Sequence, residues 1–120
     1  MIKARHLDKA SHNEDFFKSL DINKTKFTDW IVNGIFYAAH HYLDAYFSGL
    51  NKHSSSHDIL DDWIEKDNKI SCIYLDYREL KQYRWRATYK STNFTPVEII
   101  EAILPKFHNV KKQIYSILNS

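Results

Sequence analysis

Cysteine, glycine and proline are scarce in this chain of 120 residues, which has one Cys, two Gly and two Pro. The single cysteine, Cys72, excludes an internal disulfide. No apolar run approaches the roughly 18 residues needed to span a bilayer, and the N-terminus lacks the basic and apolar regions of a signal peptide. We therefore expect a cytoplasmic protein with no membrane segment.

A strong charge of one sign is also missing. Lys and Arg exceed Asp and Glu by 17 to 15, and a formal net charge of +2 is too small to indicate a general polyanion binder. Any nucleic-acid site must then be a local patch. Hydrophobic residues at 43% and charged residues at 27% are ordinary for a globular chain, and we expect a single domain over residues 1–120.

Helical periodicity runs through most of the chain. Apolar residues at steps near 3.6 predict five helices, over about 4–20, 28–50, 55–64, 70–89 and from Thr95 onward. The helix over 28–50 is apolar on two sides, so we expect it at the centre of the fold. The pattern predicts an all-α, up-and-down bundle of about five helices.

Local signals mark two helix starts and one irregularity. Ser55 and Asp58 have the spacing of a capping box, and Thr95 followed by Pro96 has the pattern of an N-cap and a first helical residue. Pro105 lies inside the last apolar pattern and removes one backbone hydrogen bond, which predicts a kink or break there.

The stretch IFYAAHHYLDAYF, residues 35–47, offers possible metal ligands. His40 and His41 precede Asp44 by four and three residues, the spacing at which side chains share a helix face. The two histidines point about 100° apart, however, so they cannot both face one ion. With no HExxH pattern and no cysteine pair, we expect no metal and no cofactor. We expect one histidine hydrogen-bonded in the core, one near the surface, and Cys72 as a small buried thiol.

The segment YRELKQYRWRATYK, residues 77–90, is the densest group of basic and aromatic side chains. Arg78, Arg84, Arg86 and Tyr89 lie within it. Cations hold phosphates and aromatic rings stack on bases, so these four residues are our candidate nucleic-acid or nucleotide site.

Arg84 differs from the other arginines because it shares the apolar stripe of its helix. We expect its guanidinium to be partly buried, where it needs an anionic partner. That partner is either an internal carboxylate, such as Asp44 or Glu79, or a bound phosphate.

Taken together, these residues resemble a HEPN domain, a small helical fold named for nucleotide binding in higher eukaryotes and prokaryotes. HNEDFFKSL at 12–20, FTDWIVNGIFYAAHHYLDAYF at 27–47 and YRELKQYRWRATY at 77–89 are similar to helices of that family, and His57 resembles the histidine of its Ser-x-His segment. The resemblance implies a dimeric bundle acting in RNA cleavage, nucleotide binding, or toxin–antitoxin and defence systems. It also implies that His41 makes a buried hydrogen bond that ties helices together.

Ribonucleases of this family carry an Arg-x4-6-His motif, and this chain departs from it. The windows after Arg78, Arg84 and Arg86 hold no histidine. Tyr89 falls in the window after Arg84, but a phenol with a pKa near 10 is a poor general base at neutral pH. Whether the chain is an enzyme stays open, and the catalytic candidates are Arg84, Tyr89 and a non-standard histidine such as His41, His57 or His12.

Three functions follow as hypotheses. The first is a non-catalytic module that binds RNA, a nucleotide or a protein partner encoded nearby. The second is a metal-independent ribonuclease that uses Arg84 with a non-standard histidine. The third is a structural dimerisation or antitoxin-like protein. The expected homodimer has a basis in small residues of the central helix that allow a second helix to approach: Gly34, Ala38, Ala39, Ala45 and Gly49.

Overall fold

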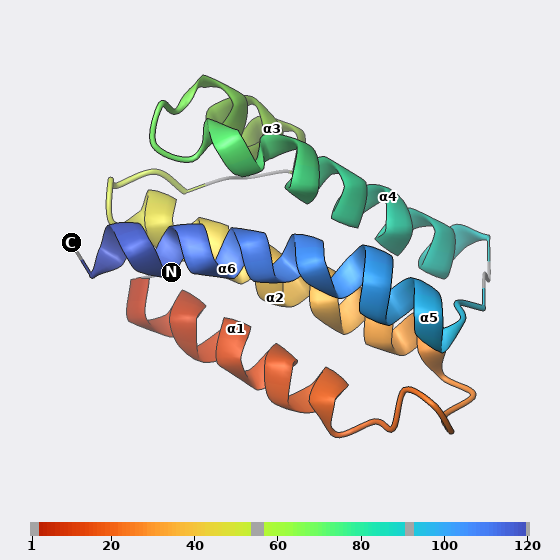
Figure 1. Ribbon diagram of the computed structural model, residues 1–120. Coiled ribbons are helices and arrows are strands. Elements are labelled where there is room, and N and C mark those ends of the chain that lie inside the picture. The colour runs from red at the N-terminus through yellow and green to blue at the C-terminus, as the bar shows by residue number, and fades with distance from the viewer. Residues whose placement is uncertain (1–2, 54–56, 91–92, 120) are drawn as a thin grey trace.

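The chain folds as a bundle of helices, described by a computed structural model for residues 3–53, 57–90 and 93–119, with 57 and 58 described for the backbone alone (Figure 1). The elements are α1 (Lys3–Lys18), α2 (Thr28–Ser48), α3 (His57–Lys66), a 3₁₀ turn (Ser71–Ile73), α4 (Tyr74–Tyr89), α5 (Pro96–Glu98), a π-helical segment (Ile99–Ile103) and α6 (Leu104–Leu118). No β-strand occurs within these ranges, which confirms the predicted all-α bundle.

Helix α2 forms the centre of the bundle, as its two apolar faces predict. Helices α1, α4 and α6 all pack along it, and Figure 1 shows α1 and α4 on opposite sides with α6 across the front. Ten of its side chains are at most 1% exposed: Ile31, Val32, Ile35, Phe36, Ala38, Ala39, Tyr42, Leu43, Ala45 and Phe47. A helix enclosed in this way places its polar side chains against neighbouring helices as well.

The helix ends lie close to those predicted. Helix α1 ends at Lys18 and α2 at Ser48, each two residues earlier than expected. The first turn of the predicted 70–89 helix is a 3₁₀ turn instead of an α-helical one. Ser55, predicted to cap α3, lies outside the described residues.

The last helical stretch begins at the predicted cap and adapts to an internal proline. The Thr95 side chain accepts a 3.1 Å hydrogen bond from the Glu98 amide, with Pro96 at the first helical position. The predicted kink or break at Pro105 takes the form of a π-helical segment, Ile99–Ile103, and the helix then continues into α6. Proline lacks an amide hydrogen and its ring collides with the carbonyl four residues earlier, so a wider turn just before Pro105 accommodates both constraints.

The small residues of α2 are covered by the chain itself. A Cβ added to Gly34 would come within 3.2 Å of side-chain atoms of both Phe16 and Phe17 in α1. Ala38, Ala39 and Ala45 are completely buried in the same way. The premise that a second protomer approaches these four positions was therefore wrong. Gly49, the fifth predicted position, is exposed just after α2, and the homodimer stays a prediction.

A buried carboxylate, Glu14, joins α1, α2 and α6. Its side chain is 6% exposed, accepts a hydrogen bond from the Tyr42 hydroxyl, and lies 3.0 Å from both Lys18 Nζ and Lys111 Nζ. Burial by itself raises the pKa of Glu14, but the hydrogen bonds from Tyr42, Lys111 and Lys18 together lower that pKa below its ordinary value. The charged carboxylate is thus held in place by three donors.

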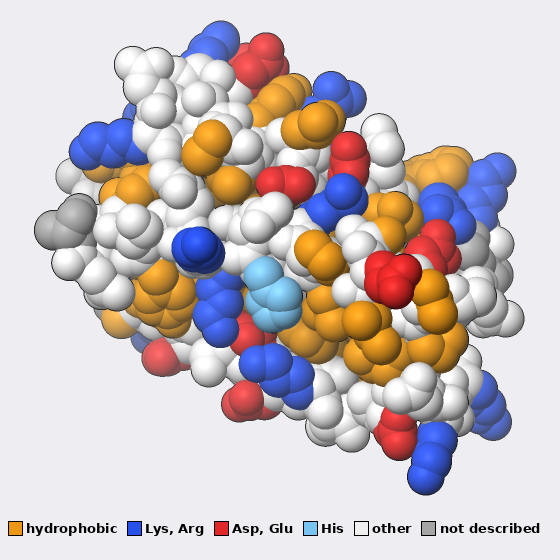
Figure 2. All heavy atoms as spheres, viewed as in Figure 1, with side chains coloured by type: hydrophobic (Ala, Val, Ile, Leu, Met, Phe, Trp, Pro, Cys, Tyr) orange, Lys and Arg blue, Asp and Glu red, His pale blue; other side chains and the backbone are white. Residues whose placement is uncertain are grey.

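The outer face over α6 mixes charges of both signs. Figure 2 shows Lys and Arg side chains interspersed with Asp and Glu, and hydrophobic side chains gathered where Figure 1 places α5. Val97 of α5 is 61% exposed and Ile100 of the π-helical segment is 48% exposed. A face of this composition does not produce the extended positive field that attracts nucleic acid along a whole surface.

Glu14→Gln should lower the free energy of unfolding at pH 7 by about 1–3 kcal/mol, because it removes the charge that two lysines and a buried phenol stabilise. The pKa of Glu14 is lowered in the folded state, so the wild type gains this stability above the ordinary carboxyl pKa and loses it as the pH falls through the folded-state value. The difference between the two proteins should therefore shrink below about pH 4.

Urea unfolding of both proteins across a pH series measures this difference. Asp15→Asn, at the exposed neighbouring position, is the control and should change stability little. A gap between wild type and Glu14→Gln that is equally large at pH 3 and pH 7, on the order of 1 kcal/mol or more, would contradict the assignment.

Candidate functional site

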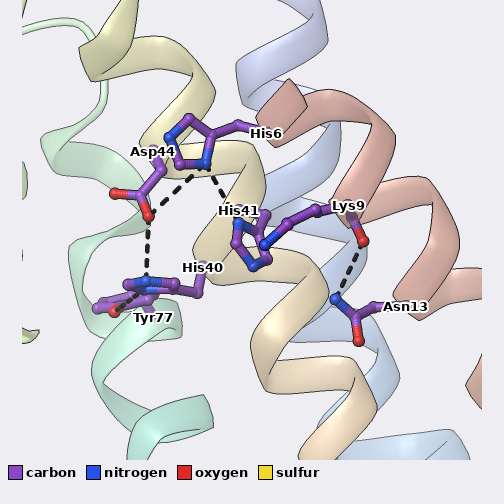
Figure 3. A network of polar contacts seen from close by, with 7 residues as sticks. All are labelled: His6, Lys9, Asn13, His40, His41, Asp44 and Tyr77. Atoms are coloured by element: carbon purple, nitrogen blue, oxygen red, sulfur yellow. Dashed lines mark hydrogen bonds and ion pairs between the residues drawn. The ribbon is translucent and has the colours of Figure 1, made fainter. Parts of the chain in front are cut away.

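His40 and Asp44 lie one turn apart on the side of α2 that meets α4. Nε2 of His40 is 3.0 Å from Oδ2 of Asp44, and Nδ1 of His40 is 3.2 Å from the Tyr77 hydroxyl (Figure 3). A carboxylate only accepts hydrogen bonds, so Nε2 of His40 carries a hydrogen. The three side chains form a connected series of hydrogen bonds from α4 to Asp44.

His41, the next residue, points toward α1. Its Nδ1 is 3.2 Å from Nδ1 of His6, and the same His6 atom is 4.0 Å from Oδ2 of Asp44. Figure 3 shows His6, His41 and Asp44 converging from the two helices. We call these three residues, with His40 and Tyr77, the imidazole cluster.

The two α2 histidines thus have different partners, as their angular separation predicts. His41 makes the hydrogen bond between helices that the family resemblance implies. The expectation that one of the pair lies near the surface needs correction, because the His40 side chain is 13% exposed and hydrogen-bonded to Tyr77. His6 was missed because 35 residues separate it from His41 and no local spacing links them.

Burial keeps both histidines of the α1–α2 contact neutral at pH 7. It lowers the pKa of His41 to about 4. Burial also lowers the pKa of His6, against the opposing effect of Asp44. With two neutral rings facing each other through Nδ1, one ring donates the single hydrogen and the other accepts it.

Arg84 also lies where α4 meets α2, beside Tyr37, which precedes His40 by three residues. Its Nη2 donates a 2.7 Å hydrogen bond to the Tyr37 hydroxyl. The guanidinium carbon lies 5.4 Å from the centre of the Tyr37 ring and 5.8 Å from that of Phe36. Its Nε is buried and has no hydrogen-bond partner in the described part of the chain. The partial burial expected from the sequence is confirmed.

The internal ion pair considered for Arg84 is not formed. Glu79 pairs with Lys106 at 2.5 Å, and Asp44 pairs with His40 at 3.0 Å. Across residues 3–53, 57–90 and 93–119, no carboxylate of a described side chain lies within 4.0 Å of the Arg84 guanidinium. Arg84 therefore keeps a partly buried positive charge that no described acidic side chain neutralises, and such a charge favours an anion beside it.

Arg84 also lines a groove of about 440 Å³ formed by α1, α2 and α4, which we call the Arg84 groove. Two of its walls are aromatic rings that remain open to solvent, Phe16 at 41% and Trp30 at 55% exposed. Polar side chains line it as well: Asn13, Asp29, Asn33, Tyr37 and Thr88. Sequence reasoning did not identify Trp30 as a site residue. Its position outside both apolar stripes of its helix was a signal that its ring is exposed.

The other predicted binding residues lie elsewhere on or beside α4. The Arg86 guanidinium packs 5.0 Å from the Phe94 ring centre and 3.7 Å from Glu98. Arg78 is exposed, and Tyr89 is 64% exposed. Neither these two residues nor Arg86 lines the Arg84 groove. The fold brings Arg84 together with residues of α1 and α2, and not with the other two arginines.

None of the histidines whose side chains are described forms a hydrogen bond with Arg84. His41 is bonded to His6, and His12 is exposed on α1. The side chain of His57 lies outside the described residues. Cys72, expected to be a buried thiol, is exposed, because the 3₁₀ turn that carries it turns its side chain outward.

Comparisons with protein-family models, with curated proteins and with solved structures gave no match for this chain. Within the described residues, none of the helices combines the length and the hydropathy of a membrane span. The chemistry of the imidazole cluster and of the Arg84 groove is therefore inferred from their own residues.

Tyr77→Phe should lower the free energy of unfolding by about 0.5–1.5 kcal/mol, because it removes a hydrogen bond between α4 and α2 at a completely buried position. Tyr89→Phe removes a hydroxyl from the same helix at a position that is 64% exposed, and should leave stability nearly unchanged. Chemical unfolding of both variants measures the contrast. Equal effects of the two substitutions would show that the His40–Tyr77 contact contributes nothing.

Proposed function

We propose that this protein is a binding module that takes a nucleotide unit, either free or within single-stranded RNA, into the Arg84 groove. The observation that carries the proposal is the Arg84 guanidinium, which is partly buried, oriented by Tyr37 and without a carboxylate partner among the described side chains. The resemblance of the chain to HEPN domains points in the same direction.

A phosphate fits the requirements of Arg84. The guanidinium is planar and carries five N–H donors. Its Nη2 group donates a hydrogen bond to the Tyr37 hydroxyl. The hydrogen bond to Tyr37 and the contacts with the Phe36 and Tyr37 rings hold the guanidinium in position before a ligand arrives. A pre-oriented guanidinium loses little conformational entropy when it forms a bidentate pair with a phosphate.

The exposed rings of the groove suit a nucleobase. Trp30 and Phe16 present hydrophobic faces to solvent, and stacking of one base on an aromatic ring contributes about 1–3 kcal/mol in single-strand binding proteins. The volume of about 440 Å³ falls within the range of small-molecule sites, roughly 300–1,000 Å³. One nucleotide, and not a folded duplex, is the unit that matches this space.

Asp29 gives the groove a negative charge that distinguishes its side from the Arg84 side. Its carboxylate lines the same groove as Arg84 and repels a phosphate, whereas it accepts hydrogen bonds from base amino groups and ribose hydroxyls. The phosphate therefore binds at the Arg84 side and the base or ribose toward Asp29. Ribose hydroxyls are what distinguish RNA from DNA at such a position.

Arg84→Ala should weaken binding of a short fluorescent single-stranded RNA by about 10- to 100-fold at low salt, because it removes a charged hydrogen-bond donor worth about 1.5–3 kcal/mol. Trp30→Ala should weaken it by a similar factor through lost stacking. Fluorescence anisotropy gives the dissociation constants, and competition with mononucleotides shows whether a free nucleotide occupies the same groove.

Arg78→Ala is the matched control, since it removes the same charge from an exposed position of the same helix outside the groove. Loss of RNA binding that is as large for Arg78→Ala as for Arg84→Ala would refute a specific role for the groove, and so would absence of binding at low salt. Cleavage of the RNA in the presence of EDTA, abolished by Arg84→Ala, would favour the ribonuclease hypothesis instead.

A further inference from the structure

We propose that His6, His41 and Asp44 form a binding site for one divalent transition-metal ion of the zinc type, which joins α1 to α2. This site is separate from the Arg84 groove and independent of the proposed RNA binding. The three residues come from two helices, and each presents one ligand atom to a common point (Figure 3).

The spacing of the ligand atoms suits a small metal ion. Nδ1 of His6 and Nδ1 of His41 are 3.2 Å apart, Nδ1 of His6 and Oδ2 of Asp44 are 4.0 Å apart, and all three ligand atoms lie within 4.8 Å of one another. In a tetrahedral site with bonds of about 2.0–2.1 Å, ligand atoms are separated by roughly 3.3 Å. The two nitrogens already have this separation, and a movement of the Asp44 carboxylate by ~1 Å completes the set.

Residues around the site hold the ligands in orientation. His40 Nε2 donates to Oδ2 of Asp44, and Nδ1 of the same His40 ring is hydrogen-bonded to the Tyr77 hydroxyl. Ligating carboxylates in metal sites are themselves hydrogen-bonded in this manner, which fixes their direction. The side chains of His6 and Asp44 are 10% and 12% exposed and His41 is half-buried, so the ligands are drawn from a packed region.

The hydrogen shared by the two imidazoles has to move for a metal to bind. Imidazole binds a metal through a nitrogen that carries no hydrogen, and one of the two Nδ1 atoms carries the hydrogen of the His6–His41 bond. That ring has to shift its hydrogen from Nδ1 to Nε2, so that both rings bind the ion as neutral imidazoles.

The ligand types indicate the class of ion. Two imidazole nitrogens and one carboxylate oxygen favour zinc and its first-row neighbours, whereas magnesium and calcium prefer oxygen ligands. Three protein ligands leave one tetrahedral position for water. Figure 3 also shows the Lys9 side chain beside His41, where its charge opposes a cation and so reduces the affinity.

The first test is titration of EDTA-treated, tag-free full-length protein with zinc by calorimetry, together with thermal unfolding. We expect one zinc ion per chain and a rise in Tm with zinc concentration, since the ion binds the folded state. His6→Gln, His41→Gln and Asp44→Asn should each weaken zinc binding by at least tenfold. His40→Leu, which removes the hydrogen bond to Asp44, should weaken it by about 10- to 100-fold.

His12→Gln is the matched control, because it removes an exposed histidine from α1 and should leave zinc affinity unchanged. Lys9→Gln should tighten binding by removing a nearby positive charge. If a variant fails to fold, ¹⁵N NMR of the histidine rings of the wild-type protein takes the place of that variant. Zinc should shift the Nδ1 resonances of His6 and His41 and leave those of His12 unchanged.

Two results would overturn the proposal. One is the absence of stoichiometric zinc binding and of any zinc-dependent rise in Tm of the wild-type protein. The other is zinc affinity in a folded His41→Gln variant that equals the wild-type affinity, because the ion would then be bound elsewhere on the surface.

Discussion

The enclosure of α2 by three other helices is the constraint on which the rest of the structure depends. Its apolar faces bury ten side chains almost completely, and apolar burial is the dominant favourable contribution to folding. Because α1, α4 and α6 all pack along the same helix, the polar residues of α2 cannot avoid contact with them. Both candidate sites arise at these unavoidable polar contacts, and neither is placed on a loop.

The polar residues of α2 also fix the positions of the neighbouring helices relative to it. Tyr37 accepts from Arg84 of α4, His40 contacts Tyr77 of the same helix, and His41 contacts a histidine of α1. A buried polar group without a partner costs about 1–3 kcal/mol, so a rotation or shift of α4 or α1 that broke these contacts would be unfavourable even if apolar packing tolerated it. Hydrophobic burial holds the bundle together, and these few hydrogen bonds select one arrangement of it.

Sequence periodicity was sufficient for the helices and for the central position of α2, because amphipathic spacing is a local property. The cap at Thr95 was predictable for the same reason. Which helix covers a given face is decided by the tertiary arrangement, so the sequence did not show that Gly34 packs against α1. It equally did not show the His6–His41 contact, which joins residues far apart in the chain, or the exposure of Trp30 at the edge of a groove.

The separation of Arg84 from Asp44 would allow the two proposed sites, one for an anion and one for a cation, to lie along the same helix. A direct ion pair between them would have neutralised both charges inside the bundle, but Arg84 donates to Tyr37 and Asp44 is paired with His40. Tyr37 and Asp44 are about two turns apart on α2, roughly 10 Å along its axis. At that distance and near solvent the two charges interact weakly, so the charge on Arg84 does little to weaken the proposed cation site, and the charge on Asp44 does little to weaken the proposed anion site.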